Sequence, residues 1–205
     1  SSQNEQDSRY YGKFANIPIL EPSNQQEAYD MVYEGYELSE KYRVPVLLRI
    51  TTRLAHSRSG VERREVRPQK PMSLPKDAKQ FILLPAMARV KYRVLLSNQA
   101  NFRKEAQLSR FNSYTEGEDK RMGIIACGIA FNYLMENFRK SKPDNPVLKI
   151  CQYPMPLDLL KKITDECEEI LVLEDGYPFV EELVNGLLGR GIKVKGRLDG
   201  TLPRD

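Results

Sequence analysis

The sequence predicts an α/β protein whose larger unit is a doubly wound parallel sheet. From Met122 onward, apolar segments of about five residues alternate with segments of helical spacing. The helical segments that connect the apolar segments are too long for hairpin loops. They suit right-handed crossovers between parallel strands. A shorter α/β segment and a basic connector come first. We therefore expect three regions, at residues 1–58, 59–120 and 121–205.

The larger unit begins with the stretch MGIIACG, Met122 to Gly128. Ile124 and Ile125 lie in an apolar run that is typical of a buried strand, and the residues after Gly128 have apolar side chains at helical spacing. The same alternation continues to the end of the chain. It predicts strands at Val147–Cys151, Ile170–Glu174 and Ile192–Lys195, and helices that begin at Leu157 and Pro178.

Composition excludes several classes of protein. The chain has 205 residues, 40% of them hydrophobic and 29% charged, which is typical of a globular protein. Its net charge of +4 arises from basic residues mixed with 28 acidic ones, so neither nucleic-acid nor membrane binding is indicated. No apolar run approaches the roughly 20 residues of a membrane helix, and the first residues do not resemble a secretion signal. We expect a soluble, cytoplasmic protein.

Cysteine and histidine are too few for common metal sites. Cys127, Cys151 and Cys167 form no C-x-x-C motif, and two of them lie in predicted buried strands, so we expect core residues. His56 is the single histidine, which excludes a zinc site built on several imidazoles. No metal ligands are predicted in this chain.

The first region contains one clear helix and one strand. Ser23-Asn24-Gln25-Gln26 matches a capping box, and the spacing that follows predicts a helix from Asn24 to about Tyr42. Pro45 precedes a predicted strand at Val46–Ile50. These two elements cannot enclose a core. Either they pack on the larger unit or they end a domain that begins upstream, and we favour the second interpretation.

Residues 57–121 read as a basic connector, because four prolines interrupt the pattern and arginines and lysines dominate. The main interpretation is a solvated linker. A phosphate or nucleic-acid patch is the alternative, but interleaved aromatic residues and a binding-module motif are missing. Pro85 suits the first turn of a helix running to about Ser109, which would clamp the regions it joins.

Ligands of parallel sheets bind beyond the carboxyl ends of the strands, so the loops to inspect are those at Gly128, Gln152–Pro156 and Glu174–Pro178. The G-x-G-x-x-G spacing of dinucleotide sites is missing. Glu174 and Asp175 form a carboxylate pair suited to acid–base chemistry, but Asp175 also begins an ordinary turn. We favour the structural role, and we assign no catalytic residue.

Four stretches together resemble the large (alpha) subunit of indolepyruvate ferredoxin oxidoreductase, within the 2-oxoacid:ferredoxin oxidoreductases and the thiamine diphosphate enzyme superfamily. They are SSQNEQDSRYYGKFANIPILEPSNQQEAYD, VPVLLRITTRLAHSR, GIIACGIAFNYLMENF and LVLEDGYPFVEELV followed by GRLDGTLP. The resemblance covers nearly the whole chain, with only the connector matching loosely.

This resemblance implies an enzyme that decarboxylates arylpyruvates oxidatively to acyl-coenzyme A, with ferredoxin as the electron acceptor. Thiamine diphosphate with magnesium and iron–sulfur clusters would belong to the full-length enzyme, and a small beta subunit would be the partner. Residues 1–58 resemble the end of a pyrimidine-binding domain, and residues 121–205 resemble a transketolase-C-terminal-like domain. The cofactor-binding segments of the family are missing, so we expect this chain alone to be inactive and to bind none of these cofactors.

The family pattern also suggests site residues. It places the first residues in a loop that faces the cofactor cleft: Ser2, Gln3, Asn4, Glu5, Gln6 and Asp7. Arg53 and His56 are second-tier candidates for the cleft rim or for a domain contact. The last region would serve as a scaffold and electrostatic wall, with its YPMP and EDGYPF loops contacting neighbouring domains or subunits.

Two alternatives to this function stay open. The chain could be a non-catalytic α/β interaction or scaffold module that keeps the fold without the catalysis. It could also belong to a 2-oxoacid ferredoxin oxidoreductase of different substrate specificity, because the residues that select an indole group lie mostly outside this chain.

Overall fold

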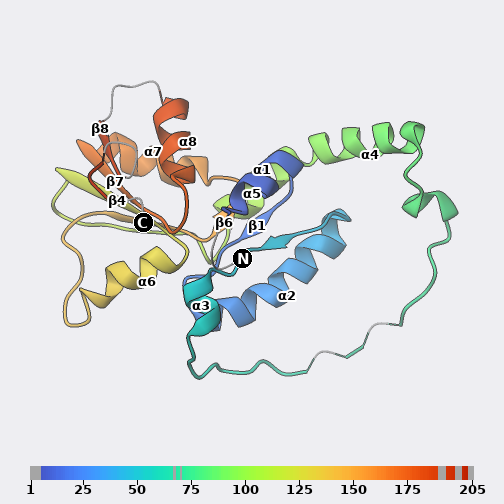
Figure 1. Ribbon diagram of the computed structural model, residues 1–205, viewed down its shortest axis with the longest axis horizontal. Coiled ribbons are helices and arrows are strands. Elements are labelled where there is room, and N and C mark those ends of the chain that lie inside the picture. Colours follow the sequence, from blue (N-terminus) through green and yellow to red (C-terminus); the bar gives the residue numbers. More distant parts are fainter. Residues whose placement is uncertain (1–5, 67, 70, 189–192, 197–199, 203–205) are drawn as a thin grey trace.

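The computed structural model describes residues 6–66, 68–69, 71–188, 193–196 and 200–202. These residues form one five-stranded and one three-stranded sheet, with helices packed around them and an extended segment that leaves the body and returns to it (Figure 1).

The five-stranded sheet confirms the predicted fold class. Its strand order is β3-β5-β4-β7-β8, and every neighbouring pair is parallel except β3 with β5. The four predicted strands are present, and the antiparallel edge strand β3 was not predicted. The bounds are β3 Ser113–Thr115, β4 Met122–Cys127, β5 Val147–Ile150, β7 Glu169–Leu173 and β8 Lys193–Lys195.

Helices cover both faces of this sheet. Helix α6, Ile129–Glu136, lies on one face, whereas α7, Leu157–Glu166, and α8, Phe179–Leu188, lie on the other (Figure 1). Strand β4 is buried along nearly its whole length, which explains why its sequence is apolar at successive positions. The doubly wound arrangement is thus confirmed.

The three-stranded sheet joins the first region to the larger unit. Its order is β2-β1-β6, with β1 parallel to β2 and antiparallel to β6. Strand β6 follows β5 after the single residue Cys151, and the side-chain oxygen of Asn112 accepts hydrogen bonds from the Cys151 and Gln152 amides at 2.7 and 2.9 Å. The bounds are β1 Ile19–Leu20, β2 Leu47–Leu48 and β6 Gln152–Tyr153.

Successive residues of β1 face two hydrophobic clusters. Ile19 packs in the larger cluster with Ile125 and Ile163, while Leu20 packs in a smaller one with Met31. The first region therefore packs on the larger unit, as the alternative interpretation stated. Whether it also completes a domain with upstream residues stays a prediction.

Helix α2, Gln25–Tyr42, confirms the predicted helix with a small shift at its start. Asn24, not Ser23, caps the helix, because its side chain accepts the Glu27 amide at 2.9 Å. Glu27 in turn accepts hydrogen bonds from the Ser23 amide and hydroxyl. The capping box thus lies one residue later than predicted. Two further helices were not predicted, α1 at Arg9–Ala15 and α3 at Thr52–His56.

The connector contains a short 3₁₀ helix, η1 at Ala78–Phe81, and two α-helices where one was predicted: α4, Pro85–Ser97, and α5, Gln99–Gln107. Helix α5 buries Phe102 and Ala106, so it provides the predicted clamp. Helix α4 buries none of its residues and points away from the body (Figure 1).

Two predictions about composition can be compared with the structure. The three cysteines are free and buried, which confirms them as core residues. Among the described residues, every helix is too short or too polar to span a lipid bilayer.

Candidate functional site

Five buried charged residues lie where strands of both sheets end. Glu21 follows β1, Arg49 follows β2 and Glu174 follows β7, so three strands deliver charges to one place. Asp7 and Arg9, at the start of α1, complete a cluster that we name the charge network. None of the five side chains belongs to a residue more than 6% exposed. The network occupies the sheet edge where α/β proteins bind ligands.

Arg9 is the centre of the charge network. Its Nε donates to Asp7 Oδ1 at 2.9 Å, and its Nη1 donates to Glu174 Oε2 at 2.8 Å. Its Nη2 pairs with Asp7 Oδ2 and donates to the Tyr177 carbonyl at 2.9 Å. The guanidinium also lies 5.2 Å from the centroid of the Phe179 ring. One side chain therefore connects α1 to the loop after β7.

Arg49 makes a second set of contacts. Its Nη1 pairs with Glu21 Oε1, its Nε lies 3.5 Å from Asp7 Oδ1, and its Nη2 donates to the Asp175 carbonyl at 2.9 Å. The Tyr153 hydroxyl donates to the other Glu21 oxygen at 2.8 Å. Arg49 and Glu21 thus join the three-stranded sheet to the loop that leaves the five-stranded sheet.

Two glycines are required for this packing. Gly128, which follows β4, has φ +49°, and a Cβ there would lie 2.6 Å from Glu21 Cγ. Gly176 has φ +98°, and a Cβ there would lie 2.7 Å from Asp7 Oδ2 and 2.9 Å from Arg49 Nη2. Both conformations favour glycine, and both positions lack room for a side chain. The loops after β4 and β7 can therefore lie this close to the network only with glycine at positions 128 and 176.

The carboxylates of the network differ in their pKa values. Burial by itself would raise the pKa of Asp7, but the hydrogen bond and charge of Arg9, together with the charge of Arg49, hold it below its ordinary value. Burial raises the pKa of Glu174 in spite of Arg9 and of the Val180 and Glu181 amides, which donate to it at 3.0 and 3.1 Å. Of these two carboxylates, Asp7 is therefore the more firmly held as an anion.

Two polar side chains beside the network stay protonated. Burial, reinforced by nearby negative charge, raises the pKa of the Tyr153 hydroxyl and of the Cys127 thiol well above their ordinary values. A thiol in this state is a poor nucleophile, since the thiolate is the reactive form. The network thus lacks an activated cysteine.

The charge network is closed, which limits its chemistry. Throughout the described residues, every buried side-chain nitrogen and oxygen has a hydrogen-bond partner. The same residues contain no group of three or more His, Cys, Asp or Glu side chains that could hold a metal ion. The carboxylates of the charge network are instead engaged by Arg9, Arg49 and backbone amides. Its geometry fixes loops in place instead of presenting free ligands.

The structure does not place all the predicted site residues together. Ser2, Gln3, Asn4 and Glu5 lie outside the described residues. Gln6 is exposed, and its side-chain oxygen accepts a hydrogen bond from the Tyr11 hydroxyl at 2.6 Å.

Asp7 belongs to the charge network, whereas the second-tier candidates lie on α3. Arg53 and His56 are both exposed, and the Arg53 guanidinium lies 6.0 Å from the ring centroid of Tyr133 on α6. The structure does not bring Arg53 and His56 into the network. Their assignment to a cofactor cleft stays a prediction.

Sequence reasoning missed Arg9, Glu21 and Arg49. The pattern contained one usable indication, because Glu21 and Arg49 interrupt or directly follow short apolar strands where a charge would be buried. Glu174 was considered, and its structural role was favoured. The partners themselves could not be found from spacing, since Arg9 and Glu174 are 165 residues apart.

Relatives of this chain are indolepyruvate oxidoreductase subunits. The chain is 41% identical to the indolepyruvate oxidoreductase subunit IorA of Methanothermobacter marburgensis over 209 aligned residues, which cover 99% of the chain and 34% of the relative. It is also 41% identical to the IorA subunit of Pyrococcus abyssi, covering 100% of the chain and 33% of that subunit. The chain thus spans about a third of the length of these relatives.

A solved structure supports the fold. The 2-oxoglutarate:ferredoxin oxidoreductase from Magnetococcus marinus, with 2-oxoglutarate, coenzyme A and succinyl-CoA bound, matches 88% of this chain and 39% of its own, with a TM-score of 0.60 and 15% sequence identity. No protein-family model matches the chain. The resemblance inferred from the sequence is confirmed: over nearly its whole length, this chain is homologous to one third of indolepyruvate oxidoreductase subunit IorA.

Proposed function

We propose that this chain forms part of a subunit that oxidatively decarboxylates arylpyruvates, indolepyruvate among them, to acyl-coenzyme A with ferredoxin as the electron acceptor. The observation that carries the proposal is the identity of about 40% to IorA subunits along nearly the whole chain. The fold shared with a 2-oxoglutarate:ferredoxin oxidoreductase agrees with it.

Within that enzyme, the charge network would hold the loop that carries the predicted cleft residues. Asp7 ends that loop, and its carboxylate contacts Arg9, Arg49 and the Tyr177 amide. Fixing Asp7 would restrict the neighbouring Gln6, because each residue of the backbone has only two soft dihedrals. We therefore assign Asp7, Arg9 and Glu174 as positioning residues, and Gln6 as the described residue that faces outward from the loop.

The finer assignments follow from the family alone. Thiamine diphosphate would supply the decarboxylation chemistry and iron–sulfur clusters the electron path, with the ligands for both outside the described residues. A small beta subunit, ferredoxin and coenzyme A are the proposed partners. Three free, buried thiols agree with a reducing compartment, and so we propose a cytoplasmic location.

The first experiment uses the native protein, isolated without oxygen through an antibody against this chain. Its intact mass, iron and thiamine content and indolepyruvate-dependent dye reduction would be measured together. We expect a polypeptide well above 23.7 kDa that contains both cofactors and reduces the dye. A native chain of 23.7 kDa without cofactor would instead establish the non-catalytic interaction module.

A second experiment tests the positioning role in the complete enzyme. Glu174→Gln keeps the side-chain shape but removes one charge beside Arg9, so we expect a partial loss of kcat with normal subunit assembly. If this variant abolished turnover while the assembly stayed intact, the scaffold assignment would be wrong. Comparing indolepyruvate with an aliphatic 2-oxo acid in the same assay tests the alternative substrate specificity.

A further inference from the structure

Gln6 is the exposed residue next to the charge network. Asp7, which follows it in the chain, is held by Arg9 and by the Tyr177 amide, so the backbone after Gln6 continues into a fixed point. The network lies where strands end, at the edge at which α/β proteins bind ligands. The side-chain amide of Gln6 is therefore exposed beside a position that suits a ligand.

The side chain of Tyr11 fixes the orientation of this amide. The Tyr11 hydroxyl donates to Gln6 Oε1 at 2.6 Å. A primary amide has one oxygen, which accepts, and one nitrogen, which carries two donor hydrogens. The oxygen is already engaged, and within the described part of the chain no residue accepts a hydrogen bond from Gln6 Nε2. The nitrogen is thus the part of the amide that a ligand can use.

Helix α1 holds Tyr11 in place. The ring of the preceding residue, Tyr10, lies 5.1 Å from the Phe179 ring, measured between centroids. The following residue, Gly12, packs so closely on β1 that an added Cβ would lie 2.3 Å from Ile19 Cγ1. Both neighbours of Tyr11 are therefore fixed on the body of the molecule, while Tyr11 itself is 55% exposed. Its hydroxyl is a preorganised group at the surface.

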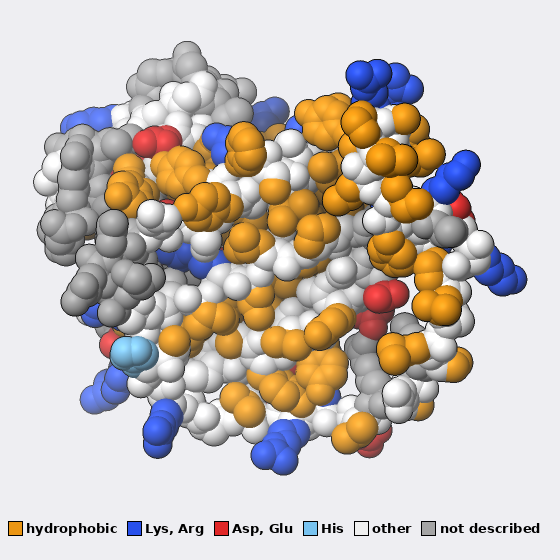
Figure 2. Space-filling model, turned by 45° about the vertical axis from the view of Figure 1, so that its right-hand side comes forward, with side chains coloured by type: hydrophobic (Ala, Val, Ile, Leu, Met, Phe, Trp, Pro, Cys, Tyr) orange, Lys and Arg blue, Asp and Glu red, His pale blue; other side chains and the backbone are white. Residues whose placement is uncertain are grey.

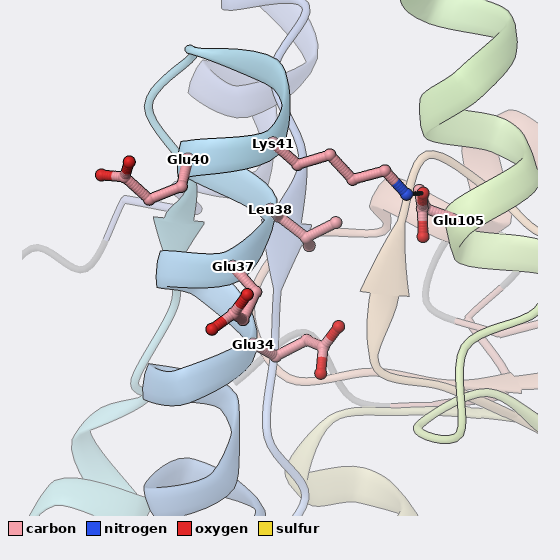
Figure 3. A pocket seen from close by; sticks show the side chains of 6 residues that line it. All are labelled: Glu34, Glu37, Leu38, Glu40, Lys41 and Glu105. Atoms are coloured by element: carbon pink, nitrogen blue, oxygen red, sulfur yellow. Dashed lines mark hydrogen bonds and ion pairs between the residues drawn. The ribbon is translucent and has the colours of Figure 1, made fainter. Parts of the chain in front are cut away.

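Two other surface features do not suit an anionic substrate. An open pocket of about 500 Å³ lies between α2 and α5, but four of its six lining residues are glutamates (Figure 3). Lys41, which also lines it, already pairs with Glu105 at 2.5 Å. Figure 2 shows a face on which hydrophobic side chains gather, and exposed apolar residues of α4 such as Val90 and Val94 have no side-chain donor. Neither feature offers hydrogen-bond donors to a carboxylate.

The amide of Gln6 fits the carboxylate that every 2-oxo acid carries. Its nitrogen can donate to an anionic oxygen, and hydrogen bonds to a charged acceptor are stronger than those between neutral groups. The amide is itself neutral, so it adds no charge beside a network in which three carboxylates face two arginines. A donor that is already oriented also loses little conformational freedom when the substrate binds.

We propose that Gln6 donates from its amide nitrogen to the carboxylate of the 2-oxo acid, and that Tyr11 is a positioning residue that holds the amide in this orientation. The inference rests on the proposed function and deepens it, because it names the part of the substrate that Gln6 binds. Tyr11 acts only through Gln6.

The first test uses the complete enzyme, in which the full-length subunit is joined to its partner subunit, and measures dye reduction. Gln6→Ala should raise the KM for indolepyruvate roughly tenfold, because a hydrogen bond to a charged group is lost. Tyr11→Phe should raise it roughly threefold with kcat nearly unchanged, as expected for a loss of uniform binding. The matched control Tyr36→Phe removes the same hydroxyl from an exposed residue of α2 and should leave KM unchanged.

The double variant Q6A/Y11F separates the positioning role from a direct contact. Its KM should equal that of Gln6→Ala, because Tyr11 then has no amide to orient. Independent effects of the two residues would instead multiply to roughly 30-fold. The KM for coenzyme A should stay at the wild-type value in all these variants, since the contact concerns the 2-oxo acid.

A binding measurement without turnover identifies the group that Gln6 contacts. Isothermal titration calorimetry of the same enzyme would compare indolelactate, which keeps the carboxylate, with tryptophol, which lacks it. Gln6→Ala should weaken the binding of indolelactate roughly tenfold and leave that of tryptophol unchanged.

Several results would overturn the inference. Equal weakening of both ligands by Gln6→Ala would exclude the carboxylate as the acceptor. An effect of Tyr11→Phe that persists in the Gln6→Ala background would exclude the positioning role. If neither KM nor binding changed in an enzyme that oxidises indolepyruvate, the inference would fail and the proposed function would stand. A wild-type enzyme that oxidises no 2-oxo acid would overturn the proposed function, and this inference with it.

Discussion

The charge network and helix α4 reverse the usual distribution of residues in opposite ways. The network places five charged side chains in the interior, whereas α4 exposes apolar side chains such as Val90, Tyr92 and Val94. Burial of charge is stable only when each charge has partners, and the network supplies them within one chain. The apolar side chains of α4, in contrast, are not covered by the described part of the chain. The comparison teaches that the buried charges are satisfied within the described part of the chain, whereas the apolar side chains of α4 stay exposed there.

The largest expected effect comes from removing the centre of the network. Arg9→Met would leave Asp7, Glu21 and Glu174 without their shared cation, and we expect the free energy of unfolding to fall by about 3–5 kcal/mol. Urea denaturation measures the change. Arg103→Met, at an exposed position of α5, is the control and should stay within about 0.5 kcal/mol of the wild type. Equal effects of the two variants would show that the network contributes no stability.

A smaller loss is expected at Gly176. Alanine there would require a strained φ and would press against Asp7 and Arg49, costing about 2–3 kcal/mol. Gly186 in α8 has no atom within 4 Å of an added Cβ, so Gly186→Ala should be neutral or stabilising by about 0.5 kcal/mol. Thermal unfolding of both variants tests the claim, and a tolerated Gly176→Ala would show that the loop can move away from the network.

The pH dependence of stability separates Asp7 from Glu174. Since the folded-state pKa of Asp7 lies below its unfolded value, its contribution is complete above the ordinary aspartate range and is lost as pH falls through the folded pKa. The stability difference between wild type and Asp7→Asn should be on the order of 2 kcal/mol at pH 7 and should shrink below pH 4 or so. A difference that stays constant over pH 2–7 would contradict this sign.

The smallest effect is expected on α4. Val94→Ala on α4 should change the free energy of unfolding of the dilute chain by less than about 0.5 kcal/mol, because Val94 is exposed. Val184→Ala on α8 removes the same atoms from a buried site and should cost about 2 kcal/mol. The comparison would fail if Val94→Ala were as destabilising as Val184→Ala in the monomer.

The parallel strands could be predicted because the burial of each strand is reflected in the apolar pattern of its own residues. Met122–Cys127 is apolar at successive positions, since a central strand is covered on both faces, and Leu160 and Ile163 follow the helical period of α7. Helix α2 could also be located from its cap and its spacing. These elements depend on neighbours a few residues away, which is the range over which periodicity carries information.

The path after β5 was not predictable from pattern. Val147–Cys151 reads as one strand, but the chain changes sheets at Cys151 because the Asn112 side chain accepts the amide hydrogen bonds of Cys151 and Gln152. The partner of β6 is β1, far away in the sequence. Two hydrogen bonds accepted by one side chain therefore accompany the change of direction of the backbone, and they leave no periodic pattern in the sequence.

The charge network was only partly predictable for the same reason. The family resemblance named Asp7 as a candidate for the cofactor cleft, and the strand-end rule pointed to the loop at Glu174. Their connection through Arg9 depends on tertiary packing that sequence spacing does not contain. The exposed state of α4 was likewise unexpected, because its amphipathic pattern is the same whether its cover belongs to this chain or to another.

The pairing of β1 with β6 has a consequence for synthesis on the ribosome. Tyr153, whose hydroxyl donates to Glu21, is synthesised 132 residues after Glu21. Glu174 is synthesised 165 residues after its partner Arg9. At roughly 5–20 residues per second, the first strand waits on the order of ten seconds for its neighbour. During that interval β1 lacks its neighbour β6 and Arg9 lacks Glu174, although β2 and Asp7 are already present. Nascent chains of this protein should therefore depend on a chaperone until about residue 180 has emerged.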